Sequence, residues 1–342
     1  MGRRPSRNKN LPTGMRARHR GKFGTYYYLD TGDLPRKEIS LGKDYVLAVK
    51  KWSELTSAKP MNDLVTFRYT AERYVRDVLP TKAPATQKDN LRELNQLYKF
   101  FDDPPAPLET IEPVHVRQYL DFRSSAKVRA NREKALFSHV WNYARERGLT
   151  SRENPCRGIK GFKEAGRDVY IDDDIYEIVL AHAEVPLKDA IELAYLTGQR
   201  PSDVLKCVRS DIKNGELWVK QGKTGARLRI KLEGALADLI KRMSSRKVMS
   251  LSLVNTMDGS PMTKAMLRGA FDRARDAAVV AHPKYEAKIR EYQFRDLRAK
   301  AGTDKEQSDG MAAAKDQLGH TNEAMTKHYV RHRKGKLVTP TK

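Results

Sequence analysis

The sequence predicts a multidomain α+β protein that is mainly α-helical and carries small β-sheets. Three observations lead to this fold class. Short segments rich in β-forming residues precede a helix in the first 60 residues, four segments with helical periodicity follow over 62–160, and strands alternate with helices from 168 onward. A chain of 342 residues, 39% of them hydrophobic, is long enough for two or three domains with buried cores.

The first region, residues 1–60, predicts a small β-sheet packed on one helix. Residues 24–29 and 36–42 are rich in β-formers and are separated by a turn signal, and apolar residues recur at helical spacing over 44–52. A sheet of this size buries little apolar surface, so we expect it to need DNA or a neighbouring domain to be firm.

A basic segment begins the chain. Residues 1–22 carry eight Arg or Lys and neither Asp nor Glu. Such a segment is typical of a disordered, solubilising arm or of an arm that contacts DNA, and the basic composition of the whole chain favours DNA contact. The candidate DNA-binding residues in this segment are Arg3, Arg4, Arg7, Arg16 and Arg18.

The second region, residues 62–160, predicts a small helical domain. Apolar residues recur at helical intervals in four segments, which are 64–79, 86–101, 111–123 and 127–147. The expected core positions include Leu91, Leu94, Leu97, Tyr98 and Phe101. Basic residues expected to grip DNA phosphates are Arg123, Lys127, Arg129 and Arg132. Residues 158–167, with three glycines and three basic residues, are typical of a linker that crosses the DNA backbone.

Charge and cysteine content narrow the class of protein. The net charge of +23 and the pI of about 9.9 predict a polyanionic partner. No run of about 18 apolar residues predicts a membrane span, and the N-terminus lacks the apolar stretch of a secretory signal, so we expect a soluble intracellular protein. Cys156 and Cys207 form no CxxC pair, which argues against a disulfide scaffold or a thiolate zinc site.

The third region, from 168 to the C-terminus, mixes helices and strands. We expect helices over 187–197, 202–208, 294–299 and 322–328, and strands over 217–220 and 227–232. The three aspartates at 172–174 suit a helix start better than a metal site, because no second acidic cluster accompanies them. We therefore expect no metal and no other cofactor.

The candidate catalytic residues of this region are cationic side chains and one tyrosine. Arg200 lies at a tight corner before Pro201, where its planar guanidinium can match two phosphate oxygens, and Asp203 can hold it in place. Lys223 lies at the tip of the predicted hairpin. Although Gly222-Lys223-Thr224 has the form of a P-loop end, position 217 is Leu rather than Gly and no helix follows, so an ATPase is excluded.

The last candidates lie toward the C-terminus. Arg295 and Arg298 are three residues apart and are expected to share a helix face. His320 follows a glycine, and Tyr329 comes nine residues later. A tyrosine beside arginines and a histidine can attack a phosphodiester and hold the DNA end as a phosphotyrosine.

In residue type and order, Arg200, Lys223, Arg298, Leu318-Gly319-His320 and Tyr329 resemble the tyrosine recombinase (phage integrase) family. The three-region layout resembles the lambda-integrase type. This resemblance implies an arm-type DNA-binding domain over 1–60, a helical core-binding (SAM-like) domain over 62–160 and a catalytic domain with a C-terminal tail over 168–342.

The resemblance also implies a reaction. Tyr329 would form a 3′-phosphotyrosine, the cationic side chains would stabilise the pentavalent phosphorus, and Lys223 would protonate the leaving 5′-oxygen, without ATP or metal. Free monomers would assemble as a homotetramer on double-stranded attachment sites in the bacterial cytoplasm, and the tail after Tyr329 would pack on a neighbouring protomer. An accessory DNA-bending protein is compatible with this scheme.

One position departs from the family pattern. Arg295 stands where the family usually has histidine, and an arginine cannot act as a base. A catalytically weak or inactive sequence-specific DNA-binding protein therefore stays open as the alternative. A type IB topoisomerase uses similar chemistry, and a metal-dependent nuclease is disfavoured by the scattered carboxylates.

Overall fold

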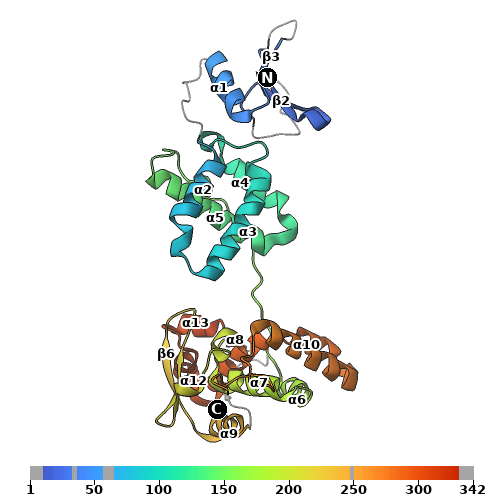
Figure 1. Cartoon of the computed structure of the whole chain (residues 1–342), viewed down its shortest axis with the longest axis vertical. Coiled ribbons are helices and arrows are strands. Elements are labelled where there is room, and N and C mark those ends of the chain that lie inside the picture. The colour runs from blue at the N-terminus through green and yellow to red at the C-terminus, as the bar shows by residue number, and fades with distance from the viewer. Residues whose placement is uncertain (1–10, 33–36, 57–64, 247–249, 331–342) are drawn as a thin grey trace, which may run out of the picture. The chain divides into compact units, whose positions relative to one another are not determined.

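The computed structural model describes residues 11–32, 37–56, 65–246 and 250–330. Arg3, Arg4, Arg7 and the tail from 331 to 342 lie outside the described residues. The chain divides into two compact units, Met1–Ala165 and Gly166–Lys342. Helices dominate both units, and each holds one small antiparallel sheet, which confirms the predicted fold class (Figure 1). Among the described residues, no helix is long and apolar enough to cross a membrane.

The N-terminal sheet of the first unit has three antiparallel strands in the order β1-β2-β3. Its elements are β1 (Met15–His19), β2 (Thr25–Asp30), β3 (Glu38–Gly42) and the helix α1 (Tyr45–Leu55). Asp44 caps α1 by accepting a hydrogen bond from the backbone N–H of Leu47 at 2.9 Å. Met15, Tyr27, Leu29 and Val49 are among the residues that form the core of sheet and helix.

Strand β1 is an element that the sequence did not predict. It lies within the basic segment, where Arg16, Arg18 and His19 leave no regular alternation of apolar and polar residues that would indicate a strand. The strand forms because its backbone pairs with β2 over five residues, from Met15 opposite Leu29 to His19 opposite Thr25. Residues 15–19 of the basic segment therefore form a strand of the sheet.

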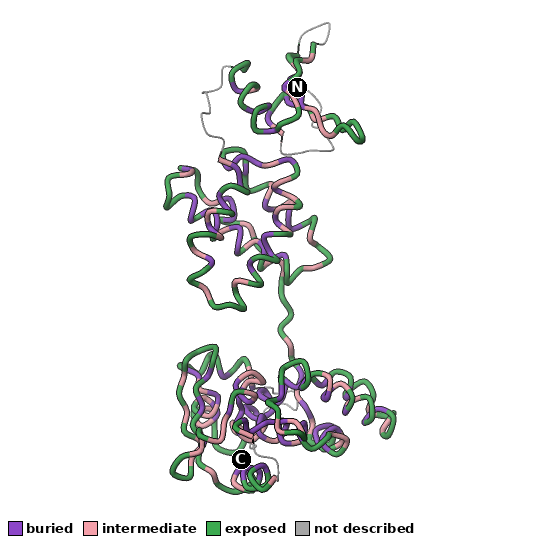
Figure 2. Tube along the Cα trace, viewed as in Figure 1, coloured by how far each residue is buried: buried purple, intermediate pink, exposed green. Residues whose placement is uncertain are grey.

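Four helices make up the rest of the first unit, as the periodicity predicts. They are α2 (Phe67–Asp77), α3 (Pro84–Phe101), α4 (Pro113–Phe122) and α5 (Lys127–Glu146). Their buried faces are turned toward one another (Figure 2). In the aromatic core between them, Phe67 stacks on Phe137 with ring centroids 4.8 Å apart. Leu94, Leu97 and Phe101 are buried as expected and Tyr98 is partly buried, but Leu91 is 46% exposed, so its assignment to the core was wrong.

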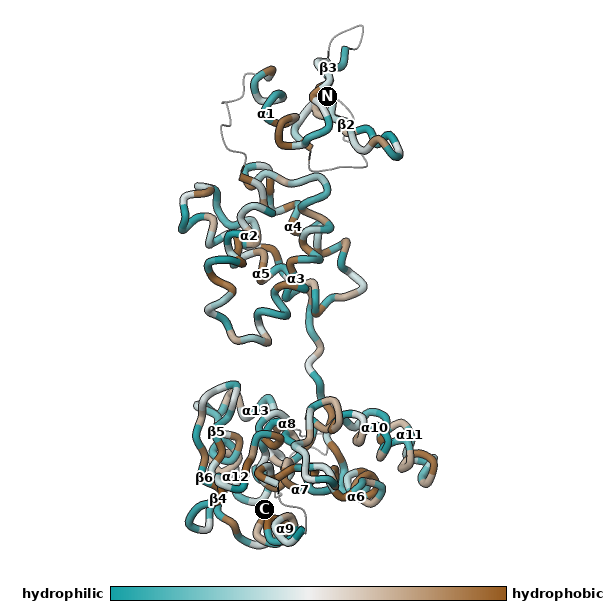
Figure 3. Tube along the Cα trace, in the orientation of Figure 1, coloured by the Kyte–Doolittle hydropathy of each residue, from teal (hydrophilic) through white to brown (hydrophobic). Residues whose placement is uncertain are grey.

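In the second unit the helix α7 (Val185–Thr197) is largely buried, and the unit also contains the sheet β4-β5-β6. Hydrophobic residues are dense along α7, and most of them are buried (Figure 3). The other elements are α6 (Asp173–Ala181), α8 (Pro201–Val204), β4 (Ile212–Lys213), β5 (Glu216–Lys220), β6 (Arg227–Lys231), α9 (Gly234–Ser244), α10 (Lys264–Ala281), α11 (Glu286–Glu291), α12 (Leu297–Leu318) and α13 (Glu323–Lys327). Short 3-10 turns occupy Gly21–Phe23, Leu79–Thr81, Leu108–Thr110, Ser124–Ala126, Arg209–Asp211, Pro283–Tyr285 and Phe294–Asp296.

Two local expectations for this unit need correction. The helix expected over 202–208 is the four-residue α8, because the chain turns at Leu205 and pairs Val208 with Ser252. Asp172 does precede α6, but its side chain makes no capping hydrogen bond; it accepts one from Lys288 at 2.8 Å instead.

The helix α12 reverses direction at Gly310, whose backbone is non-helical with φ 87° and ψ 172°. A straight helix of this length would separate its ends by about 30 Å. Instead the Arg298 guanidinium donates to the carbonyl of Leu318 at 2.7 Å, and a Cβ built on Gly302 would lie 2.8 Å from the side chain of Leu318. The two halves of α12 therefore pack against each other, and the reversal returns the chain to the start of the helix.

Candidate active site

Four parts of the second unit meet around the candidate catalytic residues. They are the corner between α7 and α8, the turn between β5 and β6, the start of α12 and the turn between α12 and α13. Gly198 ends α7 in a left-handed conformation and Arg200 directly precedes α8, so the corner presents the arginine from a backbone anchored on both sides.

Arg298 is the buried centre of the site, with 2% of its surface exposed. Its Nη1 donates to the carbonyl of Gly198 at 2.8 Å, and its Nη2 donates to that of Leu318. Burial, and then the charge of Arg200, lowers the pKa of the guanidinium from 12.5 to about 10, so Arg298 stays charged at neutral pH. Its buried Nε has no acceptor among the described residues, so one donor of the guanidinium is unpaired.

His320 follows the left-handed Gly319 and lies against Arg298. Its Nε2 is 3.0 Å from Nη2 of Arg298, and its Nδ1 is 3.0 Å from Oγ1 of Thr326. Burial first, and then the charges of Arg298 and Arg200, lower the pKa of the imidazole from 6.5 to about 4. We infer a neutral ring in which Nε2 accepts from Arg298 and Nδ1 carries the proton, because arginine can only donate.

Tyr329 lies two residues after the end of the short helix α13, which Asn322 caps by accepting from the N–H of Met325. The Tyr329 N–H continues the helical turn to the carbonyl of Thr326 at 2.8 Å. The ring centroid lies 5.1 Å from the guanidinium carbon of Arg298 and 5.1 Å from the ring of His320. The fold thus brings three of the predicted residues, His320, Tyr329 and Arg298, into one cluster.

Arg200 joins this cluster from the α7–α8 corner. Its Nη1 donates to Oε1 of Gln221 at 2.8 Å and lies 3.9 Å from Oδ2 of Asp203. Asp203 is buried, and its Oδ1 accepts from the backbone N–H of Gly222 at 3.0 Å. Asp203 therefore contacts both Arg200 and the turn that carries Lys223, as a positioning residue would.

Lys223 and Arg295 lie differently from the other candidates. Both side chains are exposed, and within the described part of the chain no residue forms a hydrogen bond or ion pair with either. Arg295 belongs to the 3-10 turn before α12, whereas Arg298 lies in the first turn of that helix and is buried, so the two do not share a helix face. The neighbouring Asp296 is buried and forms a bidentate ion pair with Arg167, at 2.7 and 2.6 Å.

The candidate DNA-binding residues that the structure describes in the first unit differ in how far acidic neighbours compensate their charge. Arg16, Arg18 and Arg123 form ion pairs with acidic neighbours, and that of Arg123 is a bidentate pair with buried Glu133 at 2.8 Å. Lys127, Arg129 and Arg132 are exposed on α5, and Nη2 of Arg132 lies 3.4 Å from Oε2 of Glu164. Arg123 therefore fixes α4 to α5, and its charge is largely compensated.

The sequence alone did not identify Gln199, Gln221 and Thr326 as parts of the site. All three are buried, and each hydrogen-bonds to a candidate catalytic residue or to the turns that hold those residues. Glutamine and threonine in these positions form no spacing pattern, so no local signal could have found them.

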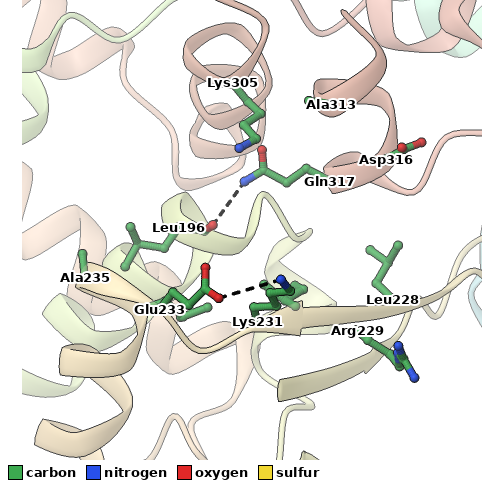
Figure 4. A pocket seen from close by; sticks show the side chains of 12 residues that line it. Leu196, Leu228, Arg229, Lys231, Glu233, Ala235, Lys305, Ala313, Asp316 and Gln317 are labelled. Carbon is green, nitrogen blue, oxygen red and sulfur yellow. Dashed lines mark hydrogen bonds and ion pairs between the residues drawn. The ribbon is translucent and has the colours of Figure 1, made fainter. Parts of the chain in front are cut away.

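A cavity of about 590 Å³ lies elsewhere, between β6, the start of α9 and α12 (Figure 4). Gln317 spans part of it by donating to the carbonyl of Leu196 at 3.1 Å. None of the six candidate catalytic residues lines this cavity. The described residues contain no group of three or more His, Cys, Asp or Glu side chains placed to hold a metal ion.

Comparisons with known proteins extend over most of the chain. Residues 172–336 match the model of the Phage integrase family. The integrase of Enterobacteria phage 434 is 28% identical over 252 residues, covering 67% of this chain and 68% of that protein. The integrase of Escherichia phage HK022 is 25% identical over 358 residues and covers 96% of both chains.

Solved structures share the fold. A lambda integrase tetramer bound to a Holliday junction aligns with 97% of this chain and 99% of that chain, with a TM-score of 0.70 and 21% identity. The Tn1549 transposon integrase, in complex with transposon right end DNA, aligns with 78% of this chain and 94% of that chain, with a TM-score of 0.65 and 16% identity.

Proposed function

Because this chain belongs to the tyrosine recombinase (phage integrase) family, we propose that it cleaves and rejoins DNA at specific sites through a 3′-phosphotyrosine at Tyr329. The observation that carries the proposal is the placement of the Tyr329 ring 5.1 Å from both the Arg298 guanidinium and the His320 ring. Such a reaction would integrate or excise a mobile element such as a prophage.

The scissile phosphate would bind between Arg200 and Arg298. The unused Nε of Arg298 and the planar forks of both arginines suit the non-bridging oxygens, on which charge grows as five-coordinate phosphorus forms. Both guanidiniums are already held by protein carbonyls or side-chain oxygens, so little reorganisation is needed when the phosphate arrives.

In the first step, Oη of Tyr329 attacks phosphorus and loses its proton to solvent. The bond from phosphorus to the 5′-oxygen breaks, and Lys223 protonates that oxygen, a role worth roughly 10²–10⁴ in rate. A 5′-hydroxyl from another strand then attacks the phosphotyrosine and releases Tyr329. Because the ester stores the bond energy, the exchange needs no ATP.

The charge of His320 in this scheme depends on whether the phosphate is bound. Its lowered pKa makes it neutral in the DNA-free protein. A bound phosphate would offset the charges of Arg298 and Arg200, which raises the proton affinity of the imidazole. His320 would then become cationic only when the substrate is in place.

We also propose the three-domain assignment of 1–60, 62–160 and 168–342 and a homotetramer on DNA. The match to HK022 integrase over 96% of both chains and the likeness to a lambda integrase tetramer bound to a Holliday junction support this layout. Deleting residues 1–60 should abolish affinity for a DNA segment distinct from the crossover site. Unchanged affinity for every attachment-site segment would contradict the arm-binding role.

The experiment that tests the reaction uses a nicked suicide substrate and a denaturing gel. Footprinting of the DNA that flanks the gene first locates the site. With excess EDTA, the full chain should form a covalent adduct, Tyr329→Phe should form none, and Tyr285→Phe, which alters a tyrosine in another turn, should react normally. An adduct with Tyr329→Phe, or a strict magnesium requirement, would contradict the scheme.

Arg295 favours the second candidate function, a sequence-specific DNA-binding protein with little or no catalysis. It stands in the position of the family's usual histidine and is exposed. This candidate predicts site-specific footprints without any adduct. The same gel therefore separates the two functions.

A further inference from the structure

We propose that Gln221 is a positioning residue that aims Arg200 and ties the Lys223 turn to the two arginines; this inference rests on the proposed recombinase function. Gln221 directly follows β5 and is 1% exposed. Gln221 is neither one of the cationic candidates nor the nucleophile, but its side chain connects the elements that carry them.

The side-chain amide of Gln221 uses every hydrogen-bonding position it has. Its Oε1 accepts from Nη1 of Arg200 and from Oγ1 of Thr224, both at 2.8 Å. Its Nε2 donates to Oε1 of Gln199 at 2.8 Å and to the carbonyl of Leu318 at 2.9 Å. Since arginine only donates and a carbonyl only accepts, the orientation of the amide is fixed.

These four partners lie on the elements that make up the site. Arg200 is at the α7–α8 corner, and Thr224 is the neighbour of Lys223 in the β5–β6 turn. The Leu318 carbonyl also accepts from Nη2 of Arg298. Gln221 therefore links the first arginine, the lysine turn and the carbonyl that holds the second arginine.

Close packing leaves this linkage little freedom. A Cβ built on Gly319 would lie 2.9 Å from Nε2 of Gln221, so the turn before His320 presses directly on the amide. Gln199 is itself held by the carbonyls of Thr197 and Gln317, at 2.9 and 3.2 Å. A shift of the amide would therefore move Arg200 and the His320 turn together.

Neither glutamate nor methionine reproduces these contacts. Glutamate has the same shape and keeps the acceptors, but it lacks both donors and places a negative charge on Arg200. Methionine fills a similar volume and makes none of the four bonds. Gln221→Met therefore removes all four hydrogen bonds, whereas Gln221→Glu removes only the two that Nε2 donates.

Thr224 allows a test that does not disturb the interior, because its side chain is exposed. Thr224→Val removes the hydroxyl that joins Gln221 to the lysine turn, and Thr224→Ser keeps it. If this bond positions Lys223, the defect of Thr224→Val concerns protonation of the leaving oxygen. A 5′-bridging phosphorothiolate substrate releases a thiolate that needs no proton, so on this substrate the defect should vanish.

The experiment measures single-turnover cleavage by the full chain on the oxygen substrate and on the sulfur substrate, with DNA affinity and thermal unfolding measured in parallel. Gln221→Met should cleave both substrates about 10–100-fold more slowly, since a misaimed arginine affects either leaving group. Gln221→Glu should be slow on both as well. Thr224→Val should lose about tenfold or more on oxygen only, and Thr224→Ser should match the parent.

Asn255→Leu provides the control for burial. Asn255 is a buried amide outside the site that donates to the carbonyls of Ser252 and Leu253. The Asn255→Leu variant should be less stable than the parent, and its cleavage rate relative to the parent should be the same on the oxygen and the sulfur substrate. If Gln221→Met cleaves at the parent rate, or if Thr224→Val slows cleavage equally on both substrates, this inference is overturned but the proposed function is not. A parent protein that forms no Tyr329 adduct would instead overturn the proposed function.

Discussion

Replacing Gly310 by alanine should destabilise the second unit through backbone strain alone. The φ of 87° and ψ of 172° at Gly310 fall in a region that is essentially restricted to glycine, and a Cβ there would meet no atom within 4 Å. Holding an alanine in this conformation costs about 1–3 kcal/mol. The smaller conformational entropy of unfolded alanine offsets about 0.4–1 kcal/mol, which leaves a net loss on the order of 1–2 kcal/mol.

The strain should also reach the candidate active site. The reversal at Gly310 places the Leu318 carbonyl on Arg298 and sets the start of the turn to His320. If the chain relieves the strain by opening the reversal, His320 moves away from Arg298. We therefore expect slower adduct formation by Gly310→Ala even where the protein is fully folded.

Urea unfolding followed by tryptophan fluorescence measures the stability change. Trp218 is the tryptophan of the second unit, so Trp52→Phe and Trp141→Phe leave one reporter for that unit. Gly269→Ala is the matched control, because Gly269 lies inside α10 and a Cβ there makes only an ordinary contact with Arg273 at 3.7 Å. The control should gain about 0.5–1 kcal/mol. A Gly310→Ala protein as stable as its parent would refute the reasoning.

Three further predictions concern single side chains. Because the folded state holds the pKa of His320 at about 4, protonation of the unfolded chain should lower stability as pH falls from 6.5 toward 4, by up to about 3 kcal/mol, and His320→Gln should flatten this dependence in urea titrations. Arg167→Gln should cost about 1–3 kcal/mol in the same assay by leaving buried Asp296 without its ion pair; an unchanged midpoint would contradict this. Leu97→Ala should lower the free energy of unfolding by about 2–5 kcal/mol, but exposed Leu91→Ala should have little effect; equal losses would contradict the burial pattern.

Local patterns predicted the elements well where one face of the element is buried. The four helices of the first unit follow the apolar periodicity, and the hairpin β5–β6 follows its β-formers and glycine turn. Strand β1 was missed because its pairing with β2, rather than its own composition, makes it a strand. Leu91 continued the periodic pattern of α3 but lies past the edge of the buried face.

The sequence indicated the candidate site as a set of residues, but it did not indicate the geometry of that site. Arg200, Arg298, His320 and Tyr329 were recognised by type and order, and the fold brings them together. Several of the contacts that hold them join residues 20 to 100 positions apart, such as Gln221 with Leu318 and Arg298 with Gly198, and no local pattern encodes such pairs. The ion pair of Arg123 with Glu133, ten positions apart, could not be predicted either, because it depends on how α4 packs against α5.

Mass spectrometry of the trapped protein–DNA complex tests the central claim most directly. After cleavage of the suicide substrate in EDTA, nuclease treatment and proteolysis, the peptide that contains Tyr329 should carry the mass of a nucleotide linked through a 3′-phosphate to the phenolic oxygen. A nucleotide on another residue, or a complex without any covalently modified peptide, would contradict the account.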